Sequence, residues 1–227
     1  MIKAIIFDLD DTLISEKDYI ISGFNHVARI LSDKTGISQN NIVSDLVNLF
    51  DTSSKYVLNR FFEKNNIEYT DELIKELISE YRSHLPNVKF YDDVLPFLKE
   101  VKNLGIKTGI ISDGYEIAQK QKLKVIEADK YFDAIILTCE LGNEYWKPHP
   151  KAFELISKKL NVAFEEMIYV GDNPEKDFYI GKLYPIITVR INRNGIYRSK
   201  DYIENIKEKY SIDSLYELTD IISKSIT

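Results

Sequence analysis

The sequence predicts an α/β fold, a Rossmann-like parallel sheet with helices on both faces and an inserted all-helical cap. After Pro86, short apolar runs alternate with segments of helical periodicity, which is typical of a parallel sheet covered by helices. Between about residues 14 and 86, apolar residues recur only at the spacing of one helix face. We therefore expect a discontinuous catalytic core, residues 1–14 and 88–227, and a helical cap over residues 15–87.

The expected strands are short apolar runs of the kind that a parallel sheet buries on both faces. The first contains Ile5, Ile6, Phe7 and Leu9, and the others cover residues 106–111, 134–137, 167–170 and 186–189. Helices are expected between them: one ending at Gly105, one after Gly114, one starting near Pro150 and one after Pro174. The cap segment has the apolar periodicity of about four helices.

Composition narrows the classes of function. The 227 residues are 44% hydrophobic and 29% charged, and the net charge is −6, so no bulk attraction for nucleic acid or an anionic membrane is expected. The apolar run near the N-terminus is too short for a membrane span or an export signal. Cys139 is the single cysteine, which rules out an intramolecular disulfide and favours a cytoplasmic location. The oligomeric state is not predicted.

Polar and ionisable residues follow four of the expected strands. In open parallel sheets, ligands bind in the crevice at the carboxyl ends of the strands. The loops at that edge are Asp8 to Thr12, Ser112 to Gly114, the loop with Lys147 and Pro148, and Gly171 to Asp177. The sequence therefore predicts one site built from all four loops.

The carboxylates in these loops favour a divalent cation and phosphate chemistry. Asp8 and Asp10 share one face of an extended segment, whereas Asp11 points elsewhere and is expected to be a bystander. Two close carboxylates repel, and a cation relieves that conflict. Oxygen-only donors, the Asp8 carboxylate with Asp172 or Asp177, suit Mg²⁺, which keeps positions for water or substrate oxygens. A phosphate is the natural source of such an oxygen.

The remaining residues suit phosphoryl transfer, which depends on positioning and charge stabilisation. Lys147 would supply a cation, and Ser112 with the amides after it would supply hydrogen-bond donors. An aspartate can act as the nucleophile and form an aspartyl-phosphate. A second carboxylate two residues further on can donate a proton to the leaving alcohol and later accept one from water.

The motifs FDLDDT, ISDG, KPHP and GDNPEKD, in that order, resemble those of the haloacid dehalogenase-like hydrolase superfamily, in the branch with a helical cap between the first and second motifs. The resemblance implies a role for each matching residue. Asp8 would be the nucleophile and a metal ligand, and Asp10 would be the general acid/base and bind the metal through its backbone carbonyl. Ser112 and the backbone at Asp113 would bind phosphate, Lys147 would be the third-motif lysine, and Asp172 would be a Mg²⁺ ligand. Asp177 and Thr12 would support these groups, Asp177 by holding a metal-bound water or Lys147.

Two positions depart from the common pattern of the family. Asp11 stands where relatives often have glycine, and Asp113 stands where they often have asparagine. A carboxylate of Asp113 pointing inward would repel phosphate, so we expect its backbone to face the ligand.

The leading interpretation is a Mg²⁺-dependent phosphatase that hydrolyses a small phosphomonoester, a sugar phosphate or a nucleotide, through an aspartyl-phosphate. Asp10 disfavours a dehalogenase or a phosphonate hydrolase, but a phosphomutase stays open. A phospho-aspartate signalling module is less favoured, because its acidic residues come in another order and it needs no cap. Substrate choice is expected to depend on the cap, with Ser15, Glu16, Lys17 and Tyr19 as candidate contacts.

Overall fold

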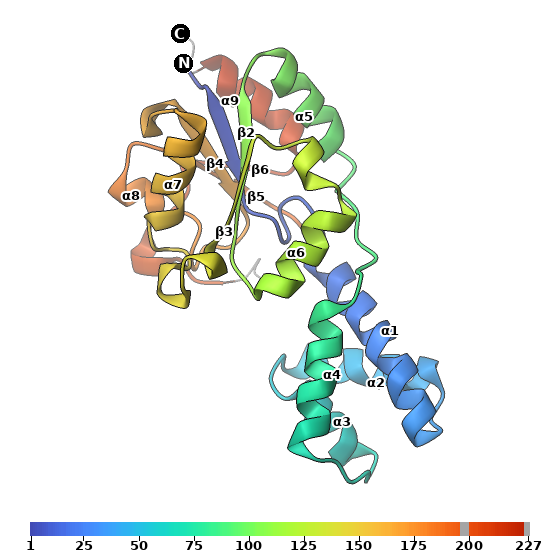
Figure 1. Cartoon of the computed structure of the whole chain (residues 1–227). Coiled ribbons are helices and arrows are strands. Elements are labelled where there is room, and N and C mark those ends of the chain that lie inside the picture. Colours follow the sequence, from blue (N-terminus) through green and yellow to red (C-terminus); the bar gives the residue numbers. More distant parts are fainter. Residues whose placement is uncertain (196–199, 225–227) are drawn as a thin grey trace. The chain divides into compact units, whose positions relative to one another are not determined.

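The computed structural model describes residues 1–195 and 200–224 of the chain. The chain forms two compact units, shown in Figure 1. The first unit comprises Met1–Glu16 and Val88–Thr227, and the second comprises Lys17–Asn87. The first unit contains the sheet, and the second consists of helices. None of the described helices combines the length and the apolar character that a membrane span requires.

The first unit is built on a six-stranded sheet with the strand order β3-β2-β1-β4-β5-β6, in which every neighbouring pair is parallel. The strands are β1 (Ala4–Phe7), β2 (Lys107–Ser112), β3 (Ala134–Leu137), β4 (Met167–Gly171), β5 (Ile187–Ile191) and β6 (Tyr210–Ile212). The first five confirm the predicted strands. The sequence analysis missed β6, an edge strand of three residues in which only Ile212 is buried, too short to show a pattern.

Helices cover both faces of the sheet. They are α5 (Val94–Asn103), α6 (Glu116–Val125), α7 (Lys151–Leu160), α8 (Ile180–Leu183) and α9 (Leu218–Lys224) (Figure 1). Short 3-10 turns lie at Ala128–Lys130, Thr138–Glu140, Asn143–Tyr145, Phe164–Glu166, Ile203–Asn205 and Leu215–Glu217. The fold class predicted from the sequence is confirmed.

One predicted helix is displaced. A helix was expected directly after Pro174, but α8 begins only at Ile180 and has 4 residues. The preceding loop is held by side chains instead: Asn173 Oδ1 accepts a hydrogen bond from the amide of Glu175, and Asp177 Oδ2 accepts one from the amide of Asn173, both at 2.9 Å. These local bonds compete with a helix for the backbone donors.

The alternation of side chains along β1 separates two hydrophobic clusters. Ile5 and Phe7 belong to the cluster that includes residues of α5 and α9, such as Phe97. Ile6 belongs to the cluster that includes residues of α7, such as Phe153. Because successive side chains of a strand point to opposite faces, β1 is buried on both sides, as its uninterrupted apolar sequence predicts.

The second unit contains the four helices expected from the periodicity. They are α1, whose Glu16–Thr35 span begins at the unit boundary, α2 (Gln39–Thr52), α3 (Val57–Lys64) and α4 (Asp71–Ser83). Ser38 and Thr70 cap α2 and α4 by accepting hydrogen bonds from the amides of Asn41 and Leu73. Gly23 allows a close approach of α1 and α4, because a Cβ there would lie 2.3 Å from the Tyr81 ring.

Candidate active site

The predicted site residues lie at the carboxyl ends of adjacent strands. Asp8 follows β1, Ser112 is the last residue of β2, and Asp172 follows β4. Because β1 pairs with both β2 and β4, these three strand ends are neighbours, as the crevice rule for parallel sheets predicts. Lys147 reaches the same place from the connection between β3 and α7.

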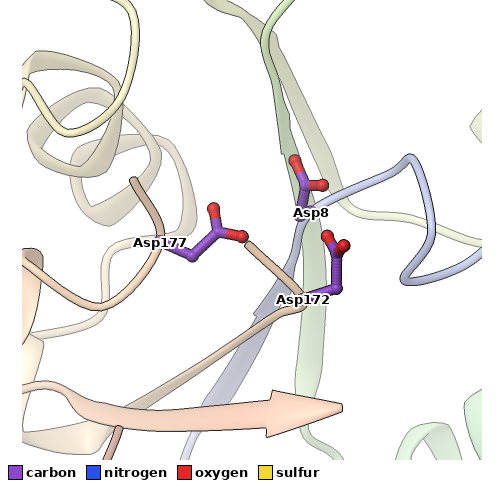
Figure 2. A group of neighbouring side chains, drawn as sticks. All are labelled: Asp8, Asp172 and Asp177. Carbon is purple, nitrogen blue, oxygen red and sulfur yellow. The ribbon is translucent and has the colours of Figure 1, made fainter. Parts of the chain in front are cut away.

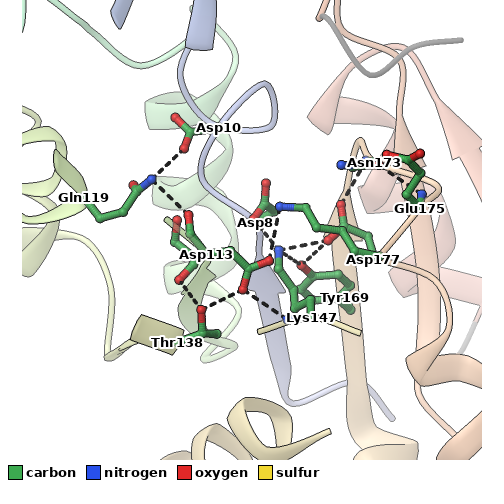
Figure 3. A network of polar contacts seen from close by, with 12 residues as sticks. Asp8, Asp10, Asp113, Gln119, Thr138, Lys147, Tyr169, Asn173, Glu175 and Asp177 are labelled. Atoms are coloured by element: carbon green, nitrogen blue, oxygen red, sulfur yellow. Dashed lines mark hydrogen bonds and ion pairs between the residues drawn. The ribbon is translucent and has the colours of Figure 1, made fainter. Parts of the chain in front are cut away.

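Lys147 is a fully buried cation among carboxylates. Its ammonium donates hydrogen bonds to Asp8 Oδ1, to Asp177 Oδ1 at 2.9 Å and to the Tyr169 hydroxyl at 2.9 Å (Figure 3), and its side chain is 0% exposed. Burial lowers the pKa of Lys147, but Asp177 and Asp8 outweigh that effect and the net shift is upward. The lysine is therefore charged and offsets part of the buried negative charge.

Asp8, Asp172 and Asp177 form a buried carboxylate trio. One oxygen of each lies within 4.8 Å of the others, and Figure 2 shows the three side chains near one another. Asp8 and Asp172 follow β1 and β4, whereas Asp177 lies in the loop before α8. Burial, reinforced by Asp177 and Asp8, raises the pKa of Asp172 to about 9. Burial also raises the pKa of Asp8 to about 6, against the opposing effect of Lys147. The positive charges of the nearby lysines thus do not fully offset the negative charge of the buried carboxylates.

This excess of charge fits a hard divalent cation. The donors of the trio are all carboxylate oxygens, which Mg²⁺ favours over nitrogen or sulfur ligands. Asp177 is the member least available to an ion, because Oδ1 accepts hydrogen bonds from Lys147 and Tyr169 and Oδ2 accepts one from the Asn173 amide. The trio can therefore hold a metal ion, with Asp8 and Asp172 as the carboxylates left to bind it.

Asp10 lies apart from the trio. Its Oδ1 and Oδ2 accept hydrogen bonds from the Lys122 ammonium at 2.7 and 2.8 Å, and Oδ2 accepts another from Gln119 Nε2 at 3.0 Å. The sequence analysis expected a cation to relieve repulsion between Asp8 and Asp10. In the structure the two carboxylates are paired with different lysines, Lys147 for Asp8 and Lys122 for Asp10.

The carboxylate of Asp113 is occupied by protein groups. Its Oδ1 accepts hydrogen bonds from Thr138 Oγ1 at 2.7 Å and from the Lys147 amide at 3.2 Å, and its Oδ2 lies 3.3 Å from the Lys176 ammonium. Burial raises the pKa of Asp113, but Lys147 and Lys176 outweigh it and hold the pKa below its usual value. The acid that replaces the common asparagine is thus compensated by two lysines.

Two buried hydroxyl groups at the strand ends lack a partner. Among the described residues, neither Ser112 Oγ nor Thr12 Oγ1 has a hydrogen-bond partner. Both residues are nearly inaccessible, at 1% and 0% exposure. An unsatisfied buried hydroxyl costs free energy, so these two groups are available to a ligand oxygen.

Asp11 has a structural role in the loop before α1, and that it takes no part in the chemistry stays a prediction. It is buried, its φ is 51°, and its Oδ1 accepts a hydrogen bond from the Glu16 amide at 2.9 Å. Its amide donates to the Ile14 carbonyl at 2.7 Å. Aspartate tolerates this left-handed conformation better than most residues, and its carboxylate satisfies the first amide of α1.

The four candidate substrate contacts are divided between the units. Ser15 and Glu16 belong to the first unit, and Lys17 and Tyr19 belong to the second. Burial, with a further contribution from Asp10, raises the pKa of Glu16 to about 8. Tyr19 is 5% exposed within its own unit. Contact of any of the four with a substrate stays a prediction.

Five neighbours of the predicted residues were missed by the sequence analysis: Gln119, Lys122, Thr138, Tyr169 and Lys176. Most gave no signal, because a lysine on a helix is usually solvated and a tyrosine in a strand is usually a core residue. Lys176 did have a signal in the sequence, because it lies inside the GDNPEKD motif.

The fold and the site together define the class: an α/β enzyme whose carboxylates and buried lysine lie at the carboxyl edge of a parallel sheet. Residues 5–190 match the model of the haloacid dehalogenase-like hydrolase family. The chain belongs to this family, which confirms the resemblance stated from its motifs.

Named relatives cover nearly the whole chain. A glyceraldehyde 3-phosphate phosphatase of Methanocaldococcus jannaschii is 31% identical over 98% of this chain and 97% of that protein. Pyrophosphatase PpaX of Bacillus mycoides is 27% identical over 98% of each. The crystal structure of a HAD phosphatase from Thermococcus onnurineus has a TM-score of 0.63 and 30% identity, covering 97% of this chain and 98% of that one. These findings confirm the prediction of a hydrolase of the phosphatase type.

A solved structure of lower identity supports the fold alone. A subfamily IA hydrolase of the HAD superfamily from Geobacter sulfurreducens has a TM-score of 0.70 at 17% identity, covering 97% of this chain and 96% of that one.

Proposed function

We propose that this protein is a Mg²⁺-dependent phosphatase that hydrolyses a small phosphomonoester, of the sugar phosphate or nucleotide class, through an aspartyl-phosphate on Asp8. The observation that carries the proposal is the buried trio of Asp8, Asp172 and Asp177, two of which, Asp8 and Asp177, pair with the Lys147 ammonium. Buried carboxylates in excess of local cations need a metal ion, and a metal ion with open positions needs an oxygen-rich substrate.

In this proposal the Asp8 and Asp172 carboxylates and the backbone carbonyl of Asp10 hold Mg²⁺. The ion would offset the charge of the phosphoryl oxygens and so favour the approach of an anionic nucleophile. Asp177 holds Lys147 through the 2.9 Å hydrogen bond. Lys147 in turn would neutralise charge on the transferring group.

The first chemical step is attack of Asp8 on phosphorus. An Asp8 carboxylate oxygen forms the new P–O bond while the bond to the leaving oxygen breaks, and Asp10 gives its proton to that oxygen. Ser112, whose hydroxyl lacks a partner among the described residues, and the backbone at Asp113 would bind phosphoryl oxygens. Thr12 would support the same loop.

The second step is hydrolysis of the aspartyl-phosphate. Asp10, now ionised, accepts a proton from water as the water oxygen bonds to phosphorus, and the bond to Asp8 breaks. Inorganic phosphate is released, Asp8 is restored, and Asp10 is protonated again, now with the proton taken from water. The products are an alcohol and phosphate.

The central experiment measures release of phosphate from phenyl phosphate with Mg²⁺ and with a chelator. Turnover should require the metal, and Asp8→Asn should remove both turnover and phosphate incorporation into the protein. Asp10→Asn should slow turnover by about 10²–10⁴-fold, the usual contribution of general acid–base catalysis. Asp92→Asn, whose side chain is 97% exposed, is the matched control and should be fully active. Full activity of Asp8→Asn or metal-independent turnover would contradict the proposal.

The substrate is proposed only as a class. The named relatives make glyceraldehyde 3-phosphate and pyrophosphate the first compounds to test, followed by a library of sugar phosphates and nucleotides. We propose that residues 15–87 act as a cap on the core of residues 1–14 and 88–227, and that Ser15, Glu16, Lys17 and Tyr19 contact the substrate. A cytoplasmic location is likewise a proposal, which rests on the single cysteine.

The assay also separates the remaining alternatives. A phosphomutase would return an isomeric phosphate ester instead of free phosphate. A phospho-aspartate signalling module would accumulate a stable phosphoprotein without turnover.

A further inference from the structure

We propose that Lys122 and Gln119, two buried side chains of α6, are positioning residues that hold the Asp10 carboxylate in place for proton transfer. This inference rests on the proposed function, in which Asp10 is the general acid/base. Neither residue belongs to the four motifs at the strand ends.

The contacts leave the Asp10 carboxylate little freedom. Lys122 Nζ lies 2.7 Å from Oδ1 and 2.8 Å from Oδ2, so the ammonium bridges both oxygens. Gln119 Nε2 donates to Oδ2 at 3.0 Å and also to the carbonyl of Asp113 at 3.0 Å (Figure 3). Gln119 therefore connects the proposed acid/base with the loop proposed to bind phosphate.

The helix that carries these residues buries polar side chains in place of apolar ones. The buried side chains of α6 are Ala118, Gln119 and Lys122, and the Lys122 side chain is only 3% exposed. Gln119 and Lys122 are three positions apart, so they lie on the same face of the helix. A helix that served packing alone would place leucine or isoleucine on that face.

A contribution to stability alone does not account for such a pair. A buried lysine–aspartate pair must recover a large desolvation cost, and apolar replacements of similar volume often give equal or greater stability. Orientation does account for it, because proton transfer requires the carboxylate within hydrogen-bond distance of the reacting oxygen. Two donors making three hydrogen bonds to one carboxylate restrict its rotamers. They leave one of its about four lone-pair positions to carry the proton that passes to the leaving oxygen.

The inference makes a prediction about leaving groups. When the P–O bond breaks, phenolate from phenyl phosphate needs the proton of Asp10, whereas 2,4-dinitrophenolate leaves without one. The ratio kcat/KM covers only the steps up to loss of the leaving group, and not the later hydrolysis step that both substrates share. A residue that acts through Asp10 should therefore lower kcat/KM for the first substrate and hardly for the second. A residue with a merely structural role should affect both substrates alike.

The experiment compares Lys122→Met, Lys122→Arg and Gln119→Leu with wild type on both substrates. We expect Lys122→Met to lower kcat/KM for phenyl phosphate by about 10- to 100-fold, part of the usual general acid–base contribution. The loss of kcat/KM on 2,4-dinitrophenyl phosphate should be less than about threefold. Lys122→Arg should recover most of the loss. Lys124→Met, an exposed position of the same helix, is the matched control.

A double-variant comparison tests the route through Asp10. In an Asp10→Asn background, Lys122→Met should cause no further loss on phenyl phosphate, because the group that it positions is already gone. Equal losses of kcat/KM on both substrates, additive losses with Asp10→Asn, or an increase in kcat/KM would overturn the inference. If Lys122→Met does not fold, Gln119→Leu must still show the selective loss of kcat/KM on phenyl phosphate, or the inference fails.

The outcome is separable from that of the proposed function. Wild-type turnover of 2,4-dinitrophenyl phosphate that requires Asp8 supports the phosphatase proposal whatever Lys122 does. If Asp8→Asn loses that turnover but Lys122→Met affects both substrates alike, only the inference about α6 is rejected.

Discussion

Replacement of Lys147 by methionine should destabilise the core unit strongly. The side chain is 0% exposed and bonds two carboxylates, Asp8 and Asp177, together with the Tyr169 hydroxyl. Methionine is of similar length but carries no charge, so both carboxylates would lose their cation while staying buried. Removal of one partner from a buried ion pair typically costs about 3–5 kcal/mol. We expect a loss of at least that size.

Thermal unfolding in the presence of a chelator measures this loss. For a unit of this size, 1 kcal/mol corresponds to about 2–4 °C in Tm, so the transition of the core unit should fall by about 6–20 °C. Tyr169→Phe removes one of the hydrogen-bond donors and keeps the ammonium, and it should cost only about 1 kcal/mol. A Tm within 2 °C of wild type for Lys147→Met, on the order of 1 kcal/mol or less, would show that the two buried carboxylates do not depend on this cation.

Three further predictions follow from the contacts around the site. Burial raises the pKa of Asp172 to about 9, so its proton must leave when a metal ion binds. The affinity for Mg²⁺, measured by calorimetry, should therefore rise about tenfold per pH unit between about pH 6 and 9. An affinity that does not change with pH would contradict the raised pKa. Because folding raises the pKa of Asp172 from 3.8 to about 9, the folded state holds a proton that the unfolded state loses, so the metal-free Tm should fall as pH rises from about 4 to 9. Asp11→Ala removes the acceptor of the Glu16 amide and should cost about 1 kcal/mol in urea unfolding, whereas no change would mean that solvent replaces the carboxylate. Lys176→Met breaks the 3.3 Å pair with Asp113 and should raise the inhibition constant of inorganic phosphate. Adding Asp113→Asn in a double variant should bring the inhibition constant back toward the wild-type value. Strictly additive effects of the two substitutions would argue against the pair.

The sequence was sufficient to predict the elements whose side chains all face the core. The run around Ile5, Ile6 and Phe7 is short, apolar without interruption and rich in β-branched residues, which is typical of a strand buried on both faces. The four helices of the second unit were equally predictable, because each shows one apolar face. β6 was not, since a strand of three residues with one buried side chain has too few positions to show a period.

The loop after β4 shows where local signals mislead. Asn173 and Pro174 are good residues for starting a helix, yet the backbone forms turns up to Ile180. The carboxylate of Asp177 reaches back to the Asn173 amide at 2.9 Å, and Lys147, distant in sequence, keeps that carboxylate in place. A contact across the fold thus overrides the local preference.

The fold class and the four polar loops could be predicted from the sequence, because periodicity and the order of motifs are local properties of a chain. Which charged side chains meet became known from the folded chain alone. It paired Asp10 with Lys122, 112 positions away, and Asp113 with Lys176, and it gave Asp11 an amide to bind. Such pairings depend on distances between segments that sequence spacing does not encode, and in a buried site those distances set the pKa of each carboxylate.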